Sequence, residues 1–166
     1  MEYLKVPYFL FPFKYHRDFK SKIITEINNQ ESSPHDDIFD TDWKTPGAPY
    51  FDIFAQQFIS EVDKRFSKYV IGKWQVGQVW YQRYKKGDKH PWHKHGNCHW
   101  TCVYYVSLPN DAPGTLIKDP YTNNIVNLQQ REGDICIFPS LSWHCSPELT
   151  VDKEKLVISL NIDLLD

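Results

Sequence analysis

The sequence lacks the features that define several large classes of protein. Its 166 residues include four cysteines, and no two of them form a Cys-x-x-Cys pair. We therefore expect reduced thiols and a cytoplasmic protein. A zinc site formed by Cys98, His99 and Cys102 stays open, although this spacing matches no common structural zinc motif. No run of apolar residues is long enough to cross a membrane.

An excess of basic charge is absent as well. The chain has 19 Lys and Arg against 21 Asp and Glu, a formal net charge of −2, and the two signs are interspersed. Phosphate contacts need clustered Lys and Arg, so no nucleic acid partner is indicated. The apolar opening at residues 3–13 is interrupted by Pro7 and Pro12 and lacks a charged leader and a small-residue cleavage site. We therefore do not expect a signal peptide.

What is present is the composition of a folded globular protein. Hydrophobic residues make up 41% of the chain and aromatic residues 16%. A chain of this length can bury a core without disulfides, and a single domain over 1–166 is the default. We expect residues 1–72 to form a helical support and residues 73–166 to form a β core. No repeat or low-complexity segment is visible.

Helical periodicity is confined to the N-terminal part. It predicts one helix near residues 18–30, which Asp18 could cap, and a second near 50–70. The apolar positions are Phe19, Ile23 and Ile27 in the first helix, and Phe51, Phe54, Phe58, Val62, Phe66 and Val70 in the second. The polar, turn-rich segment 28–49 between them is predicted to be a long surface loop, either a lid or a simple connection.

After Gly72 the pattern changes to short strands separated by turns. We also expect the first ten residues or so to be extended. The six strands predicted after Gly72 lie at 74–84, 100–108, 115–119, 124–128, 134–139 and 156–163. Strands that follow two helices predict a mainly β protein in which helices back a barrel or sandwich.

The last strand has two different faces. Leu156, Ile158, Leu160 and Ile162 share an apolar face, which we expect to pack under the helices. Lys155, Val157, Ser159 and Asn161 share the other. That second face is polar enough to border a cavity, although alternation alone is equally compatible with a face toward solvent.

Three histidines form the strongest candidate site. His93 and His95 are one residue apart, so on a strand they would share a face, and His144 comes from a distant strand. Four of the seven histidines fall within residues 90–99. Three imidazoles on one face of an octahedral metal ion leave roughly three sites open for substrate and oxygen. The spacing therefore predicts a metal centre.

The order of motifs around these histidines resembles the iron- and 2-oxoglutarate-dependent dioxygenases, especially small oxygenases of the kind found in phages and marine bacteria. The matching elements are Trp80, Gly87, His93 and His95, Tyr104 and Tyr105, Gly133 and Asp134, Phe138 to Ser140, His144, and Ile158 to Asn161. The resemblance implies a double-stranded β-helix, or jelly roll, that uses Fe(II) and 2-oxoglutarate. It further implies hydroxylation of a substrate with release of succinate and CO2.

The prolyl-hydroxylase branch of that superfamily matches residue by residue at the metal site. Its Arg-Tyr, Gly and first His correspond to Arg83-Tyr84, Gly87 and His93. The resemblance implies His93 and His144 as iron ligands. His95 stands where that branch has Asp, so three neutral ligands would leave the ion with a higher net charge.

The same resemblance implies a cosubstrate site. Lys155 lies where a basic residue pairs with the far carboxylate of 2-oxoglutarate. The branch often has a hydroxyl residue two positions later, where this chain has Val157. His90 stands where the branch has a Tyr that reaches the cosubstrate. Further cosubstrate contacts are expected from Tyr84, Ser159 and Asn161.

Cupins are a second resemblance with the same fold. Their first motif fits Gly87, His93 and His95, and their second fits Gly133, Pro139 and His144. This chain departs from it at Leu141, where cupins have Gly, and at His99, where they have Glu. A cupin could be a dioxygenase or isomerase whose substrate binds the metal directly, or a metal or ligand binder without catalysis.

The sequence indicates the kind of substrate only broadly. A small molecule or a peptide side chain would suit a site covered by segment 28–49. Aromatic residues near the histidines could stack on a planar or proline-like substrate, but core packing is the commoner role of such residues. They are Trp74, Trp80, Tyr81, Trp92, Trp100, Tyr104, Tyr105 and Trp143. Neither the substrate nor the oligomeric state follows from the sequence.

Overall fold

A computed structural model describes residues 7–35, 37–45, 47–70, 72–119 and 121–165. Residues 1–6, which belong to the predicted extended opening and to the apolar run at 3–13, lie outside the described residues. The described part of that opening forms strand β1 (Phe9–Pro12), as predicted. None of the described helices is long and apolar enough to cross a membrane.

Two antiparallel sheets make up most of the molecule. The large sheet has the strand order β1-β9-β6-β11-β4-β3-β2, and the small sheet has the order β5-β10-β7-β8. The bounds after β1 are β2 (Ser33–His35), β3 (Ile38–Thr41), β4 (Lys73–Tyr84), β5 (His90–His93), β6 (Trp100–Ser107), β7 (Leu116–Lys118), β8 (Ile125–Asn127), β9 (Asp134–Pro139), β10 (His144–Ser146) and β11 (Lys155–Leu165). The strands β4 to β11 confirm the predicted jelly roll.

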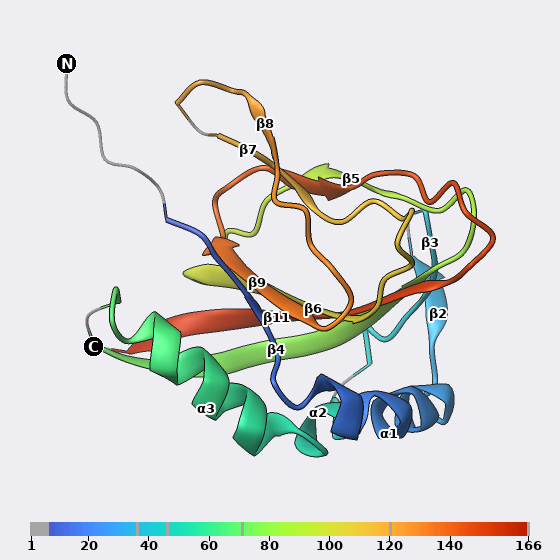
Figure 1. Cartoon of the computed structure of the whole chain (residues 1–166), viewed down its shortest axis with the longest axis horizontal. Coiled ribbons are helices and arrows are strands. Elements are labelled where there is room, and N and C mark those ends of the chain that lie inside the picture. The colour runs from blue at the N-terminus through green and yellow to red at the C-terminus, as the bar shows by residue number, and fades with distance from the viewer. Residues whose placement is uncertain (1–6, 36, 46, 71, 120, 166) are drawn as a thin grey trace.

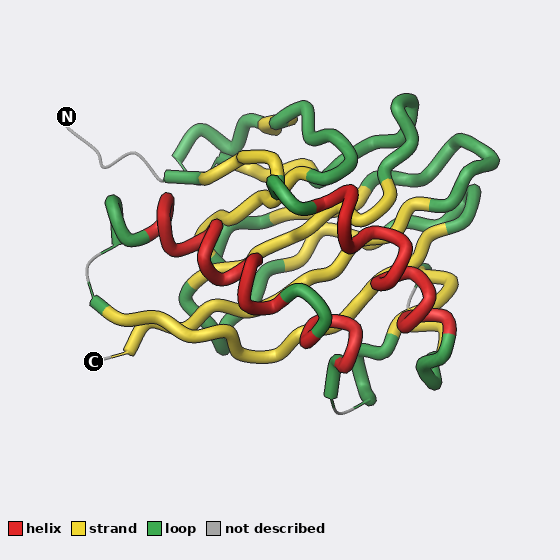
Figure 2. Tube along the Cα trace, turned by 60° about the horizontal axis from the view of Figure 1, so that its bottom comes forward, coloured by secondary structure: helices red, strands yellow, loops and turns green. Residues whose placement is uncertain are grey.

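Three helices, rather than two, back the large sheet. Figure 1 shows them on the far side of β4 and β11 from the small sheet, and Figure 2 shows α1 and α3 crossing the face of the large sheet. Helix α1 spans His16–Asn28, α2 spans Pro49–Asp52 and α3 spans Ala55–Phe66.

Both predicted helices need correction, and their C-terminal ends lie at Asn28 and Phe66 instead of near residues 30 and 70. Helix α1 begins at His16, so Asp18 lies in its first turn, where a carboxylate favours the helix dipole, and does not cap it. The predicted helix at 50–70 is interrupted because Phe54 leaves helical geometry, with φ −132° and ψ 3°. This turn buries the Phe54 ring completely, 5.3 Å from the ring of Phe51 and 5.6 Å from that of Phe58.

Segment 28–49 is also more ordered than predicted. In place of a continuous loop it contains β2 and β3, which extend the large sheet through pairing of Asp40 with Arg83 and of Thr41 with Gln82. The segment is therefore part of the main sheet. Turn-rich composition concealed these strands because each has only three or four residues.

Strand β11 separates the helix side of the sheet from the side that faces the small sheet. It lies between β4 and β6. Its residues Leu156, Ile158, Leu160 and Ile162 belong to the core beneath the helices. Val157 belongs to a second apolar cluster, which includes Ile117 of the small sheet. The predicted division of the last strand into a helix-facing side and a cavity-facing side is confirmed.

Candidate metal centre

Strand pairing in the small sheet brings two distant histidines together. Strand β10 pairs with β5, and this pairing places His144 opposite His93. The predicted strand positions of His93 and His144 are confirmed, although periodicity gave no bounds for these short strands, and the predicted strand position of His95 is wrong. His95 lies two residues beyond the end of β5, and its backbone N–H donates to the Ser140 carbonyl at 2.9 Å. A backbone contact in the turn after the strand thus positions this residue.

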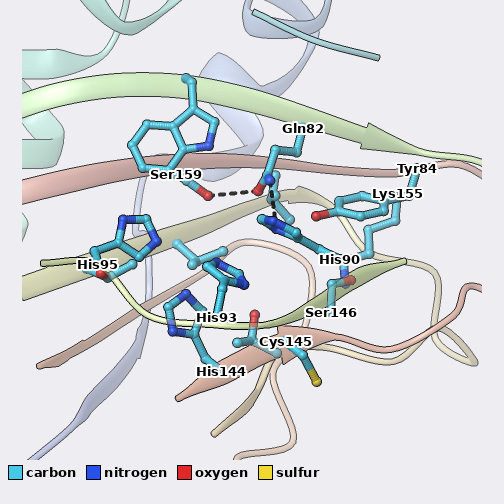
Figure 3. Close-up of a pocket in the computed structure, with 15 residues that line it drawn as sticks. Gln82, Tyr84, His90, His93, His95, His144, Cys145, Ser146, Lys155 and Ser159 are labelled. Atoms are coloured by element: carbon cyan, nitrogen blue, oxygen red, sulfur yellow. Dashed lines mark hydrogen bonds between the residues drawn. The ribbon is translucent and has the colours of Figure 1, made fainter. Parts of the chain in front are cut away.

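The three predicted metal ligands converge. One ligand nitrogen from each of His93, His95 and His144 lies within 4.8 Å of the other two. The ring centroids of His93 and His144 are 4.1 Å apart, and His95 lies 5.4 and 5.3 Å from them. Figure 3 shows the three rings together at one end of a cavity. No other group of three candidate ligands occurs in the described part of the chain, so the open alternative with Cys98, His99 and Cys102 gains no support.

Backbone carbonyls determine which ring nitrogen carries the proton in two of these histidines. The Nδ1 atom of His93 lies 2.8 Å from the Pro91 carbonyl, and that of His144 lies 2.9 Å from the Ser142 carbonyl. A carbonyl oxygen only accepts, so Nδ1 carries the proton in both rings. In this tautomer Nε2 carries no proton, which is the form in which a ring nitrogen can bind a metal ion. This arrangement fits a metal site, in which the second ring nitrogen of a ligand usually donates to a carbonyl or carboxylate.

The third ring is supported by an aromatic residue. The indole of Trp80 stacks on His95 with centroids 5.8 Å apart and an angle of 22° between the planes. Trp43 in turn packs edge-on against Trp80 at 4.4 Å. Asn161 is buried, and its side chain lies near the His95 ring. Among the described side chains, its Oδ1 is a buried atom without a hydrogen-bond partner.

Burial keeps the imidazoles neutral. It lowers the pKa of His95 to about 4 and the pKa of the adjacent His90 to about 3, and it lowers the pKa of His144 as well. Neighbouring imidazoles lower these pKa values further. Neutral imidazole is the form that binds a metal ion, so the site is prepared for one before any ion arrives.

A buried cation lies at the other end of the cavity. Lys155 is only 2% exposed, and its ammonium donates to the Pro113 carbonyl and to Ser146 Oγ, both at 2.9 Å. Its Nζ lies over the Tyr84 ring, 5.1 Å from the centroid. Among the described residues, no carboxylate pairs with it within 4.0 Å. Burial lowers its pKa to about 7.

A cation buried without a counter-ion is destabilising unless an anion joins it. Lys155 therefore fits the carboxylate of a dicarboxylate cosubstrate whose other end reaches the metal. The cavity between Lys155 and the histidines also fits the site predicted from the sequence, because Tyr84, His90 and Ser159 all line it. Asn161 is the exception, since it is not among the residues that line the cavity.

Other residues of the cavity escaped the sequence analysis as site residues. They include Gln82, Ser146, Thr101 and Thr115. Alternation along β4 could have identified Gln82, because it shares one face of that strand with Trp80 and Tyr84. Ser146 follows His144 by two residues on β10 and could have been found in the same way.

The family of the chain follows from a sequence comparison. Residues 78–161, about half of the chain, match the family model described as "Putative 2OG-Fe(II) oxygenase". The matched segment contains the three histidines and Lys155. The chain therefore belongs to the 2OG-Fe(II) oxygenase family. It is an enzyme that uses Fe(II) and 2-oxoglutarate, and the first of the two resemblances is confirmed. No curated protein matches the sequence.

Solved structures share the fold at low sequence identity. The collagen prolyl hydroxylase vCPH of Paramecium bursaria Chlorella virus-1, in complex with 2-oxoglutarate, has 16% identity, a TM-score of 0.63 and 96% coverage of both chains. HygX of Streptomyces hygroscopicus, with nickel and 2-oxoglutarate bound, has 10% identity and a TM-score of 0.74 over 96% of this chain and 84% of its own. A prolyl-4-hydroxylase of Pseudomonas putida has 13% identity and a TM-score of 0.66, with 97% and 94% coverage. These likenesses confirm the jelly-roll fold.

The lowered histidine pKa values predict acid sensitivity of the metal-free protein. An unfolded histidine binds a proton below pH about 6.5, whereas the buried rings stay neutral until the pH approaches their lowered pKa values. The unfolded state then binds more protons, so stability is lost as the pH falls below 6.5. We expect the unfolding temperature of the metal-free protein to fall from pH 6.5 to pH 5, above the range in which carboxylates titrate.

The measurement is thermal unfolding at each pH, followed by circular dichroism. The variant His144→Gln should show a shallower decline, because it lacks one neutral buried imidazole. Equal slopes in the wild type and the variant would contradict this prediction.

Proposed function

We propose that His93, His95 and His144 hold the Fe(II) and that Lys155 binds the far carboxylate of 2-oxoglutarate. The enzyme then hydroxylates a C–H bond of a small molecule or a peptide side chain. One oxygen atom of O2 enters the new hydroxyl group, and the other enters succinate as 2-oxoglutarate loses CO2. The single observation that supports this proposal most is the buried, counter-ion-free Lys155 in the same cavity as three converging imidazoles.

The bound iron would supply the redox chemistry that activates dioxygen, and the chain would supply binding and orientation. Lys155 neutralises a carboxylate in a setting from which water is largely excluded, where a charge-assisted hydrogen bond is strong. Ser146 Oγ accepts from the Lys155 ammonium, which also lies over the Tyr84 ring. These contacts would fix the direction of the cosubstrate between Lys155 and the metal.

A second pocket beside the histidines offers a position for the substrate. This pocket borders the histidines and is lined by side chains of β2, β3, β4 and the segments after β3 and β5. They include His35, Ile38, Thr41, Trp43, Trp80, Lys94 and Asn97. We place the substrate there, against Trp43 and Trp80. Segment 28–49 thus forms one wall of the proposed substrate pocket.

The four free cysteines support a reducing compartment such as the cytoplasm.

The metal-ligand assignment predicts a selective loss of metal affinity. We expect His144→Ala to weaken Fe(II) or Ni(II) binding by more than about a hundredfold, since even outer residues of metal sites contribute about 10- to 100-fold. Isothermal titration calorimetry under anaerobic conditions measures this loss. His99→Ala is the matched control, because His99 is exposed and lies outside the group of three. Comparable losses in both variants would remove the histidine triad from the proposal.

The cosubstrate assignment predicts a different pattern. We expect Lys155→Ala to weaken 2-oxoglutarate binding about ten- to hundredfold, because a hydrogen bond to a charged group contributes about 1.5–3 kcal/mol. Metal binding should stay intact. Lys153→Ala, which changes an exposed lysine two residues away, is the control.

Anaerobic titration of the Fe(II)-loaded protein with 2-oxoglutarate tests both the activity and the role of Lys155. A visible charge-transfer band, followed by succinate after exposure to air, is the expected result. Unchanged 2-oxoglutarate affinity in Lys155→Ala would exclude this lysine from the site. A protein that shows neither the band nor succinate would favour direct binding of another substrate to the metal.

A further inference from the structure

A fourth imidazole lies against the proposed metal ligands and needs a role of its own. The ring of His90 stacks on His93 with centroids only 3.9 Å apart and an angle of 26° between the planes. His90 nevertheless falls outside the group whose ligand atoms converge. In Figure 3 it lies between His93 and the Lys155 end of the cavity.

The surroundings of its Nδ1 atom separate His90 from its neighbour. The side-chain amide nitrogen of Gln82 lies 3.2 Å from His90 Nδ1. An amide nitrogen only donates, so His90 Nδ1 accepts and carries no proton. His93 has the reverse arrangement, because its Nδ1 lies against the Pro91 carbonyl. The two stacked rings are therefore opposite tautomers.

The orientation of the Gln82 amide is itself supported. Ser159 Oγ donates to Gln82 Oε1 at 3.2 Å, which leaves the amide nitrogen for His90. Both side chains are buried, at 7% and 4% exposure, and they lie on the adjacent strands β4 and β11. Figure 3 shows the relay from Ser159 through Gln82 to His90. Ser159, predicted from the sequence as a cosubstrate contact, thus has its hydroxyl hydrogen-bonded to Gln82.

A neutral imidazole that accepts at Nδ1 must carry its proton on Nε2. No hydrogen bond from His90 Nε2 to another described residue is present, and the His90 ring lines the cavity that runs from the histidines to Lys155. The His90 side chain is partly buried at this cavity, and an oxygen atom of a ligand bound there could accept from its Nε2–H. The Nε2–H form also has no lone pair at that nitrogen for a metal ion.

We propose that Gln82 is a positioning residue that holds His90 as its Nε2–H tautomer, so that His90 donates a hydrogen bond to 2-oxoglutarate and does not compete for the metal. This inference rests on the proposed cosubstrate site. It assigns different roles to two adjacent, stacked histidines: a carbonyl makes His93 a ligand, and an amide makes His90 a donor. Ser159 contributes by orienting the amide.

The tautomer can be measured directly in the metal-free protein. Long-range ¹H–¹⁵N NMR separates protonated from unprotonated ring nitrogens, and it should show His90 protonated at Nε2 and His93 and His144 protonated at Nδ1. In Gln82→Glu a carboxylate faces His90 Nδ1 and can only accept, so we expect Nδ1 to become protonated. Gln56→Glu, an exposed change on α3, should leave the His90 signals in place. A wild-type His90 protonated at Nδ1 overturns the proposal without any variant.

Binding measurements test the consequence for the cosubstrate. Gln82→Met removes the amide without adding charge, and we expect 2-oxoglutarate affinity of the Ni(II)-loaded protein to fall about two- to tenfold, the effect of one neutral hydrogen bond. Ni(II) affinity should change little, and Gln56→Met should match the wild type. Unchanged 2-oxoglutarate affinity in a folded Gln82→Met protein overturns the role of Gln82. Failure of the proposed function would give a different result: the wild-type protein would bind no metal, whichever tautomer His90 has.

Discussion

The position of β11 in the centre of the large sheet is the constraint on which the rest of the structure depends. Because it pairs with β4 on one side and β6 on the other, both of its faces are covered. One face contributes Leu156 and Ile158 to the core beneath the helices. The other holds Lys155 and Ser159 beside the cavity. Burial of a lysine on this strand requires the large apolar face behind it, since that face contributes the stability that offsets a desolvated charge.

The protonation and orientation of the candidate ligand histidines depend on residues that are not themselves candidate ligands. Backbone carbonyls of Pro91 and Ser142 hold the proton of His93 and His144 on Nδ1, and burial lowers the pKa of His144. The ring of His95 is held mainly by stacking on Trp80. The site is therefore held in one arrangement by strand pairing, a turn and aromatic packing, and a ligand would not have to organise it.

Some elements were accessible from the sequence because their signals are local. The strands with clear alternation and the helix-facing side of the last strand were predicted correctly. The three histidines predicted as metal ligands do converge. The interruption at Phe54 was missed because an uninterrupted apolar stripe favours one helix, and tertiary packing of three phenylalanines overrode it. The bounds of strands β5 and β10 were not predicted because three or four residues are too few to establish a period.

The sequence by itself determined the residue types of the site, the alternation that separates core from cavity and the family of the enzyme. Each of these depends on neighbours along the chain. Only the tertiary structure decided that Lys155 lacks a carboxylate partner among the described residues, that Gln82 faces His90, and that carbonyls face His93 and His144. The physical reason is that a hydrogen bond depends on distances of a few tenths of an ångström between segments brought together by packing. No periodicity in the sequence encodes such distances.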